Sequence, residues 1–129
     1  MAERPVDRLR RAYDVFNREG VEGILDLLDP AVVWVSRDGD SYAGHDGARR
    51  WYEHVRSSFD EIRFEPLALI DAGGGRILAE LTVHVRAVGS GVELERHVAH
   101  VWTFDDAGGA TRVEMYADLD KARAAAGLA

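Results

Sequence analysis

The chain has 129 residues, of which 47% are hydrophobic and 30% are charged, and its formal net charge at pH 7 is −7. This size and composition are typical of one globular domain, and the acidic balance argues against nucleic acid or an anionic membrane surface as the main partner. The sequence contains no cysteine, which excludes disulfides, thiolate chemistry and cysteine-bound zinc. Because the N-terminus is charged and every apolar run is short, we expect neither a signal peptide nor a membrane span, and we predict a cytoplasmic protein.

The N-terminal half predicts three helices and one strand. Residues 5–19 place Val6, Leu9, Tyr13 and Phe16 on one helical face. The segments that follow are a second helix over 21–30, a strand over 31–36, a loop over 37–47 and a third helix over 48–59.

From about residue 62 the hydrophobic period becomes two, which indicates strands. Four strands are expected, in "IRFEPLALIDA", "RILAELTVHVRAV", "VELERHVAHVWTFDD" and "ATRVEMYADL", and glycine-rich turns separate them. The tail, "LDKARAAAGLA", predicts a short helix that Asp118 or Asp120 can cap. Residues 1–129 therefore predict a single α+β domain, with helices covering one face of a curved antiparallel sheet.

The stretch "ERHVAHVW", residues 95–102, raises the question of a metal site because it holds two histidines, His97 and His100. Residues three apart in a strand point to opposite faces, so these two cannot both bind one metal. We expect no metal here. His97 is interpreted as a residue of the outer face or an interface. His100 is either a general acid or base in a pocket or a residue of a partly exposed sheet face.

The turn "GSG" suggests a strand register in which Val88 lies opposite Val92. Glu80 then lies opposite His100, and His84 opposite Arg96. The face that holds these ionisable groups and Trp102 is the candidate pocket, since pockets combine apolar walls with a few polar groups. The second face is either a dimer surface or an inner face packed by the helices, and it carries Ala79, Leu81, Val83, Val85, Ala99 and Val101.

Three stretches then follow one another in a familiar order: "AYDVFNREGVEGILDLLDPAVVWV", "YAGHDGARRWYEHV" and "HVWTFDDAGGATRVEMYADLDKARAAAGL". Together they resemble the nuclear transport factor 2-like superfamily, and specifically its branch of SnoaL-like polyketide cyclases and ketosteroid isomerases. The resemblance implies a cone-shaped α+β barrel, in which three N-terminal helices pack on a curved antiparallel sheet around an apolar pocket and a short C-terminal helix follows. It also implies chemistry without a cofactor and a homodimer formed through the sheet.

The resemblance also implies roles for single residues. Tyr13 matches the helix tyrosine of the isomerase oxyanion hole, and His100 stands in the place of its strand acid. The isomerase base falls near Trp34 or Val35, where this chain has no carboxylate. In the cyclases a strand histidine works with a late-strand aspartate, for which His100 and Asp118 are the nearest candidates.

Two functions remain open from the sequence. The first is a cyclase or isomerase acting on a small apolar carbonyl compound of polyketide or terpenoid type, with His100, Tyr13 and Asp118 as catalytic residues. The second is a non-catalytic ligand-binding or dimerisation module. In either case the expected pocket lining is Trp34, Phe16, Tyr52, Phe59, Glu80, His84 and Trp102.

Overall fold

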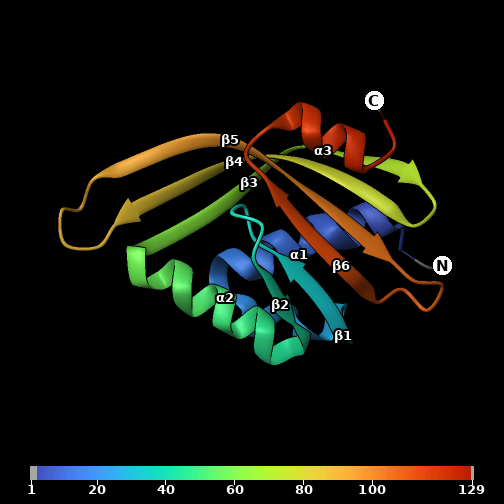
Figure 1. Ribbon diagram of the computed structural model, residues 1–129, viewed down its shortest axis with the longest axis horizontal. Helices are drawn as coiled ribbons and strands as arrows, with labels where there is room; N and C mark the ends of the chain where they lie inside the picture. The colour runs from blue at the N-terminus through green and yellow to red at the C-terminus, as the bar shows by residue number, and fades with distance from the viewer. Residues whose placement is uncertain (1–2, 129) are drawn as a thin grey trace.

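Helices and strands follow one another closely along residues 3–128, the part of the chain that the computed structural model describes (Figure 1). The elements are α1 (Pro5–Glu19), the 3₁₀ helix η1 (Val21–Leu27), β1 (Leu28–Val35), β2 (Ser41–Ala43), α2 (Gly44–Ser58), β3 (Phe59–Gly73), β4 (Arg76–Ala87), β5 (Glu93–Phe104), β6 (Ala110–Tyr116) and α3 (Leu119–Ala125).

The strands form one curved sheet in the order β2-β1-β6-β5-β4-β3. The predicted meander of four antiparallel strands is confirmed as β3 to β6. The expectation of a wholly antiparallel sheet is wrong, because β1 runs parallel to β6, with Trp34 opposite Val113. The sheet is open, since β2 and β3 form its two edges, and the cone-shaped barrel of the prediction is not confirmed.

The N-terminal half differs from the prediction in two places. The segment after Gly20 is a short 3₁₀ helix that passes into β1 at Leu28, whereas the sequence pattern predicted a helix up to residue 30. The predicted loop contains the short strand β2, and α2 begins at Gly44 rather than at residue 48. Gly44 has a φ of 72°, a backbone conformation open to glycine that turns the chain from β2 into the helix.

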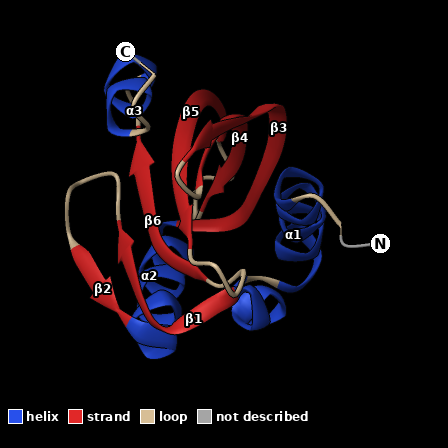
Figure 2. Ribbon diagram, turned by 90° about the vertical axis from the view of Figure 1, so that its right-hand side faces the viewer, coloured by secondary structure: helices blue, strands red, loops and turns tan. Residues whose placement is uncertain are grey.

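The two faces of the sheet carry different helices (Figure 2). The inner face packs against α1, η1 and α2 and forms the main hydrophobic core. The outer face carries α3, and Ala122 of this helix and the capping residue Ala126 cover Leu78, Ala99 and Val101. The helices therefore cover both faces, in contrast to the one covered face that we predicted.

The register between β4 and β5 is shifted by one residue from the predicted one. The N–H of Ala87 donates to the carbonyl of Val92, so the turn holds four residues instead of three. His100 lies opposite Ala79, while His84 lies opposite Glu95. Since successive strand residues alternate between faces, this shift moves every β4 residue to the other side relative to β5.

The shift overturns two expectations. Glu80 lies opposite Ala99. Glu80 and His84 therefore belong to the outer face, away from His100 and Trp102. The apolar face proposed for a dimer is also divided. The inner core buries its β4 members, which are Ala79, Leu81, Val83 and Val85. Helix α3 covers its β5 members, Ala99 and Val101.

No helix within residues 3–128 has the length and apolar character that a membrane span requires.

The turn between β3 and β4 contacts the end of β5, and this contact offers a test of the register between β4 and β5. The carbonyl of Gly75 accepts the N–H of Phe104, and a Cβ at Gly75 would collide with the Phe104 carbonyl oxygen. A Cβ at Gly74, which has a similar positive φ, meets no atom within 4 Å.

We expect Gly74→Ala to lower the free energy of unfolding by about 1–2 kcal/mol, the cost of the left-handed conformation. Gly75→Ala should cost at least about 1 kcal/mol more because the collision adds to that term. Urea unfolding of both variants measures the difference, and equal losses would contradict the contact between this turn and β5.

Candidate functional site

A hollow of about 490 Å³ lies on the concave side of the sheet, between α2, the β1–β2 loop and the inner face of β3 to β6. Its volume falls in the range of pockets that take small organic ligands. Its walls are mainly apolar and aromatic, and they include Trp51, Val55, Phe59, Phe64, Val98 and Met115.

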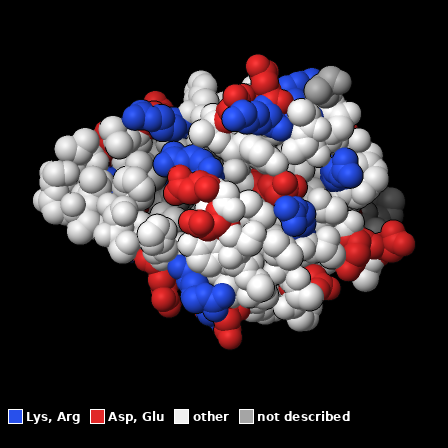
Figure 3. All heavy atoms as spheres, in the orientation of Figure 1, with Lys and Arg blue, Asp and Glu red and all other residues white. Residues whose placement is uncertain are grey.

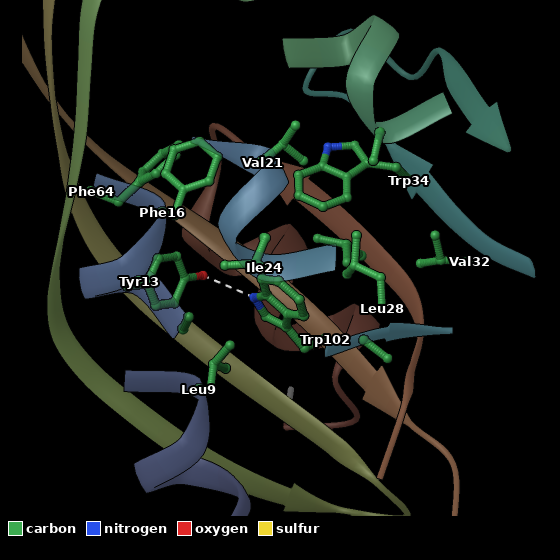
Figure 4. Packing of buried hydrophobic residues seen from close by; sticks show 14 of the residues in the cluster. Leu9, Tyr13, Phe16, Val21, Ile24, Leu28, Val32, Trp34, Phe64 and Trp102 are labelled. Carbon is green, nitrogen blue, oxygen red and sulfur yellow. Dashed lines mark hydrogen bonds between the residues drawn. The ribbon is translucent and has the colours of Figure 1, made fainter. Parts of the chain in front are cut away.

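The buried end of the hollow is closed by His100, which is 3% exposed. The Tyr13 hydroxyl lies 2.8 Å from Nδ1 of His100. The indole Nε1 of Trp102 donates to the same hydroxyl at 2.9 Å, as the dashed line in Figure 4 shows. Tyr13 comes from α1, whereas His100 and Trp102 are alternate residues of β5 and share its inner face.

The direction of these hydrogen bonds fixes the tautomer of His100. An indole N–H can only donate, so the Tyr13 hydroxyl accepts from Trp102. Nδ1 of His100 is the acceptor within hydrogen-bond distance for the hydroxyl proton among residues 3–128, so we assign that proton to the Tyr13–His100 hydrogen bond. Nε2 therefore carries the imidazole proton. Nε2 has no hydrogen-bond partner among residues 3–128. The fully buried polar side-chain atoms without a partner in these residues are Arg8 Nε and Trp34 Nε1, so Nε2 of His100 keeps some accessible surface. Nε2–H is thus the ring donor left for a ligand.

Burial keeps both titratable members of this chain neutral. It lowers the pKa of His100 from 6.5 to about 3, and it raises the pKa of Tyr13 well above its usual value of 10. At neutral pH the site therefore presents an uncharged hydrogen-bond donor rather than an imidazolium.

A small cavity of about 10 Å³ lies behind His100, lined by Tyr13, Trp34, Trp51 and Trp102. That volume is about what one water molecule requires. The indoles of Trp34 and Trp51 pack at 4.7 Å between ring centroids, and Trp34 is 1% exposed. The space beyond His100 is therefore too small for an organic ligand.

The mouth of the hollow is polar. Arg37, Asp38 and Asp40 of the β1–β2 loop, His54 of α2 and Arg96 of β5 line it, and all five are exposed. The carboxylates that line the hollow stand at this end, and no carboxylate among residues 3–128 is hydrogen-bonded to His100 or Tyr13.

The structure brings together some of the residues predicted for the site. Tyr13, His100 and Trp102 form one hydrogen-bonded chain, and Phe59 lines the hollow. Phe16 and Trp34 line the small cavity behind His100. Tyr52 packs edge-on against Phe16, at 5.5 Å between centroids, and belongs to the partly buried rim of the core.

Other predicted residues lie elsewhere. Glu80 is on the outer face, 4.0 Å from Arg123 of α3. His84 lies between Glu65 and Glu95, at 3.2 and 3.4 Å. The expectation that both face the pocket is wrong, because it depended on the register that the four-residue turn shifts.

Asp118 is exposed and caps α3, where its carboxylate accepts the backbone N–H groups of Asp120 and Lys121. It does not line the hollow. The structure thus places it in the capping position that its spacing before the last helix also allowed.

Sequence reasoning overlooked several lining residues. Trp51 belongs to the apolar stripe of α2 and could have been found from helical spacing. Phe64 and Met115 required the order of the strands. His54, Asp38 and Asp40 read as surface and loop residues, and only the fold brings them to one opening.

Among residues 3–128, no three His, Cys, Asp or Glu side chains are grouped so that they could hold a metal ion.

The fold and the hollow together define an NTF2-like α+β domain with a ligand-sized opening on its concave side. The chain belongs to the SnoaL-like domain family, whose model matches residues 9–113. This match confirms the resemblance seen in the sequence. None of the curated proteins matches the chain significantly.

Solved structures support the same assignment. An NTF2-like protein of unknown function from Burkholderia pseudomallei K96243 is 28% identical, with a TM-score of 0.81 over 95% of this chain and 97% of its own. TerC, co-crystallised with polyporic acid, is 26% identical, with a TM-score of 0.78 over 96% and 99%. A candidate polyketide cyclase from Xanthomonas campestris pv. campestris shares the fold at 21% identity, with a TM-score of 0.76 over 95% and 96%.

The lowered pKa of His100 predicts how stability depends on pH. The folded protein keeps His100 neutral, whereas the unfolded chain takes up its proton near pH 6.5. The stability that depends on neutral His100 is therefore complete above that pH and is lost as the pH falls. We expect the free energy of unfolding to drop by up to about 1.4 kcal/mol per pH unit between about pH 6 and 4 on this account.

His100→Asn, checked for folding by circular dichroism, should lose that part of the pH dependence and keep the part due to the other groups. Denaturant titrations of both proteins across this pH range measure the two slopes. Parallel slopes would mean that His100 is accessible to protons in the folded state.

Asp118 allows a test that separates helix capping from proton transfer. Asp118→Ala should lower the free energy of unfolding by about 1 kcal/mol, since it removes the acceptor of two backbone N–H groups. Asp118→Asn keeps a capping oxygen, so its stability should stay close to that of the wild type. Neither variant should change ligand binding in the hollow, as measured by calorimetry. A stable Asp118→Asn protein with weakened binding or lost turnover would restore Asp118 to the site.

Proposed function

We propose that this protein binds a small, mainly apolar carbonyl compound in the concave hollow and promotes acid/base chemistry next to that carbonyl, as a cyclase or isomerase would. One observation carries the proposal. The apolar hollow ends at a neutral histidine whose remaining donor, Nε2–H, has no partner among residues 3–128 and whose tautomer is held by Tyr13.

The chemistry follows from that donor. A carbonyl oxygen at the end of the hollow would accept a hydrogen bond from Nε2–H. When a proton leaves the neighbouring carbon, negative charge develops on this oxygen. A preorganised donor in an apolar site stabilises that charge more than it stabilises the neutral ketone. Tyr13 and Trp102 are positioning residues in this scheme, because they act through His100.

The proposed base comes from the mouth of the hollow. Asp38 and Asp40 are the carboxylates that line the hollow, and we propose that one of them receives the proton. Their place on an exposed loop at the mouth supports the second candidate function, a binding protein without turnover. The absence of a carboxylate bonded to His100 within residues 3–128 favours that alternative.

The comparisons support a small-molecule ligand but do not name it. TerC, at 26% identity, was crystallised with polyporic acid, which makes that compound a suitable first probe for this hollow. The cysteine-free sequence supports action in the cytoplasm. A homodimer through the sheet stays a proposal, but the apolar face on which the sequence based it is covered, since its β4 members lie in the inner core and α3 covers Ala99 and Val101.

A matched pair of ligands tests the role of His100. Tetralone and the hydrocarbon tetralin have nearly the same shape, but only tetralone has a carbonyl. We expect the wild type to bind tetralone about tenfold more tightly than tetralin, because one hydrogen bond in an apolar site contributes about 1 kcal/mol or more. In His100→Leu this preference should disappear while tetralin still binds. Calorimetry measures both, and a preference that survives the substitution would overturn the proposal.

Turnover is tested separately from binding. In deuterated water, NMR should show exchange of the hydrogens next to the tetralone carbonyl, faster with the wild type than with His100→Leu. Asp38→Asn and Asp40→Asn identify the base if one of them stops exchange without weakening binding. Tight binding without any exchange would favour the binding protein over the enzyme.

A further inference from the structure

We propose that Arg96 is an anion-binding residue, and that the ligand of the hollow carries an acidic group at the end opposite its carbonyl. The inference rests on the proposed function, because it concerns the other end of the same hollow and names the class of compound that would fill it.

The position of Arg96 in the strand is the first observation. The inner face of β5 is otherwise apolar or aromatic, apart from the buried His100; its members are Leu94, Arg96, Val98, His100, Trp102 and Phe104. Arg96 lies opposite the apolar Val83 of β4, and both residues line the hollow. Arg96 is exposed, so water solvates its guanidinium in the free protein, and this cation stands where the otherwise apolar hollow opens to solvent.

The second observation is that Arg96 has no carboxylate partner among residues 3–128. The guanidinium Nη1 of Arg96 donates to the backbone carbonyl of Glu95 at 3.2 Å, and Arg96 forms no ion pair with the described carboxylates. Two arginines of neighbouring strands do have such partners: Arg86 is 2.7 Å from Asp60, and Arg63 is 3.5 Å from Glu65. Most donors of the Arg96 fork are therefore available to a carboxylate or an acidic hydroxyl.

The spacing along β5 sets the size of the ligand. Arg96 and His100 are four residues apart on one face, which separates their Cα atoms by about 13 Å in a strand. Arg96 and His100 lie on the same face of β5, at opposite ends of this span. The space between guanidinium and Nε2–H then suits a compound of about two fused rings, with a carbonyl at one end and an acidic group at the other.

The mouth also contains negative charges, and they define the competing explanation. Asp38 and Asp40 of the β1–β2 loop line the same opening. Figure 3 shows acidic and basic side chains side by side near the base of the projecting β4–β5 hairpin, whose tip is uncharged. If Arg96 served to pair with this loop when a ligand is bound, its loss would weaken neutral and acidic ligands alike.

The experiment therefore compares an acid with its neutral ester. The probes are a tetralone that carries a carboxylate on its aromatic ring and the methyl ester of the same compound, titrated calorimetrically into the full chain. We expect the wild type to bind the acid about tenfold more tightly than the ester at low salt. Added salt should reduce this difference in affinity between acid and ester. Arg96→Gln should abolish the preference and leave ester binding unchanged.

Arg10→Gln is the matched control, because it removes the same charge from the exposed surface of α1, away from the hollow. It should keep the preference for the acid. A preference that is absent from the wild type, that persists in Arg96→Gln, or that is lost equally in Arg10→Gln overturns the inference. So does an equal weakening of acid and ester in Arg96→Gln, which would indicate pairing with the loop.

The two proposals fail in different ways. If the ester binds and its affinity depends on His100, but the acid gains nothing from Arg96, only the inference about Arg96 is wrong. If neither probe binds to the wild type, the proposed function fails, and this inference fails with it.

Discussion

The hydrogen-bonded chain from Trp102 through Tyr13 to His100 is the constraint on which the site depends. Burying an indole N–H, a phenol and an imidazole costs about 1–3 kcal/mol for each polar group left unpaired. The three groups satisfy one another only if α1 crosses β5 where Tyr13 reaches between two alternate residues. The same crossing packs Phe16 of α1 against Phe64 of β3, at 5.5 Å between centroids. The core and the deep end of the hollow therefore share one arrangement.

The donor-only indole at the start of this chain also decides the chemistry at its end. It orients the phenol proton toward Nδ1, and burial opposes a charge on either Tyr13 or His100. A protonated imidazole at this depth would need a buried carboxylate beside it. The chain instead offers a neutral Nε2–H donor, which can polarise a carbonyl without bringing a charge into the apolar hollow.

Local sequence patterns predicted α1, α2 and the strands β3 to β6, because amphipathic spacing and glycine turns are properties of short segments. They failed where the partner is distant or the turn is ambiguous. Nothing in "AVVWVS" shows that β1 lies beside β6, and one additional turn residue carried Glu80 and His84 to the outer face. The pairing of Tyr13 with His100, 87 residues apart, was approached only through the family resemblance. Helical spacing marks Tyr13 as a core residue and cannot name its partner.

Trp34 shows how far that resemblance extends. The isomerase base would fall at this position, but here an indole packs on Trp51 and is 1% exposed. An indole cannot accept a proton, so the deep end of the hollow offers donors without a base. The carboxylates that line the hollow, Asp38 and Asp40, belong to the exposed loop between β1 and β2. In the proposed function, proton abstraction therefore requires this loop to meet the ligand, whereas binding requires only the inner face of the sheet. In this proposal, the same hollow binds without turnover any ligand that neither Asp38 nor Asp40 reaches.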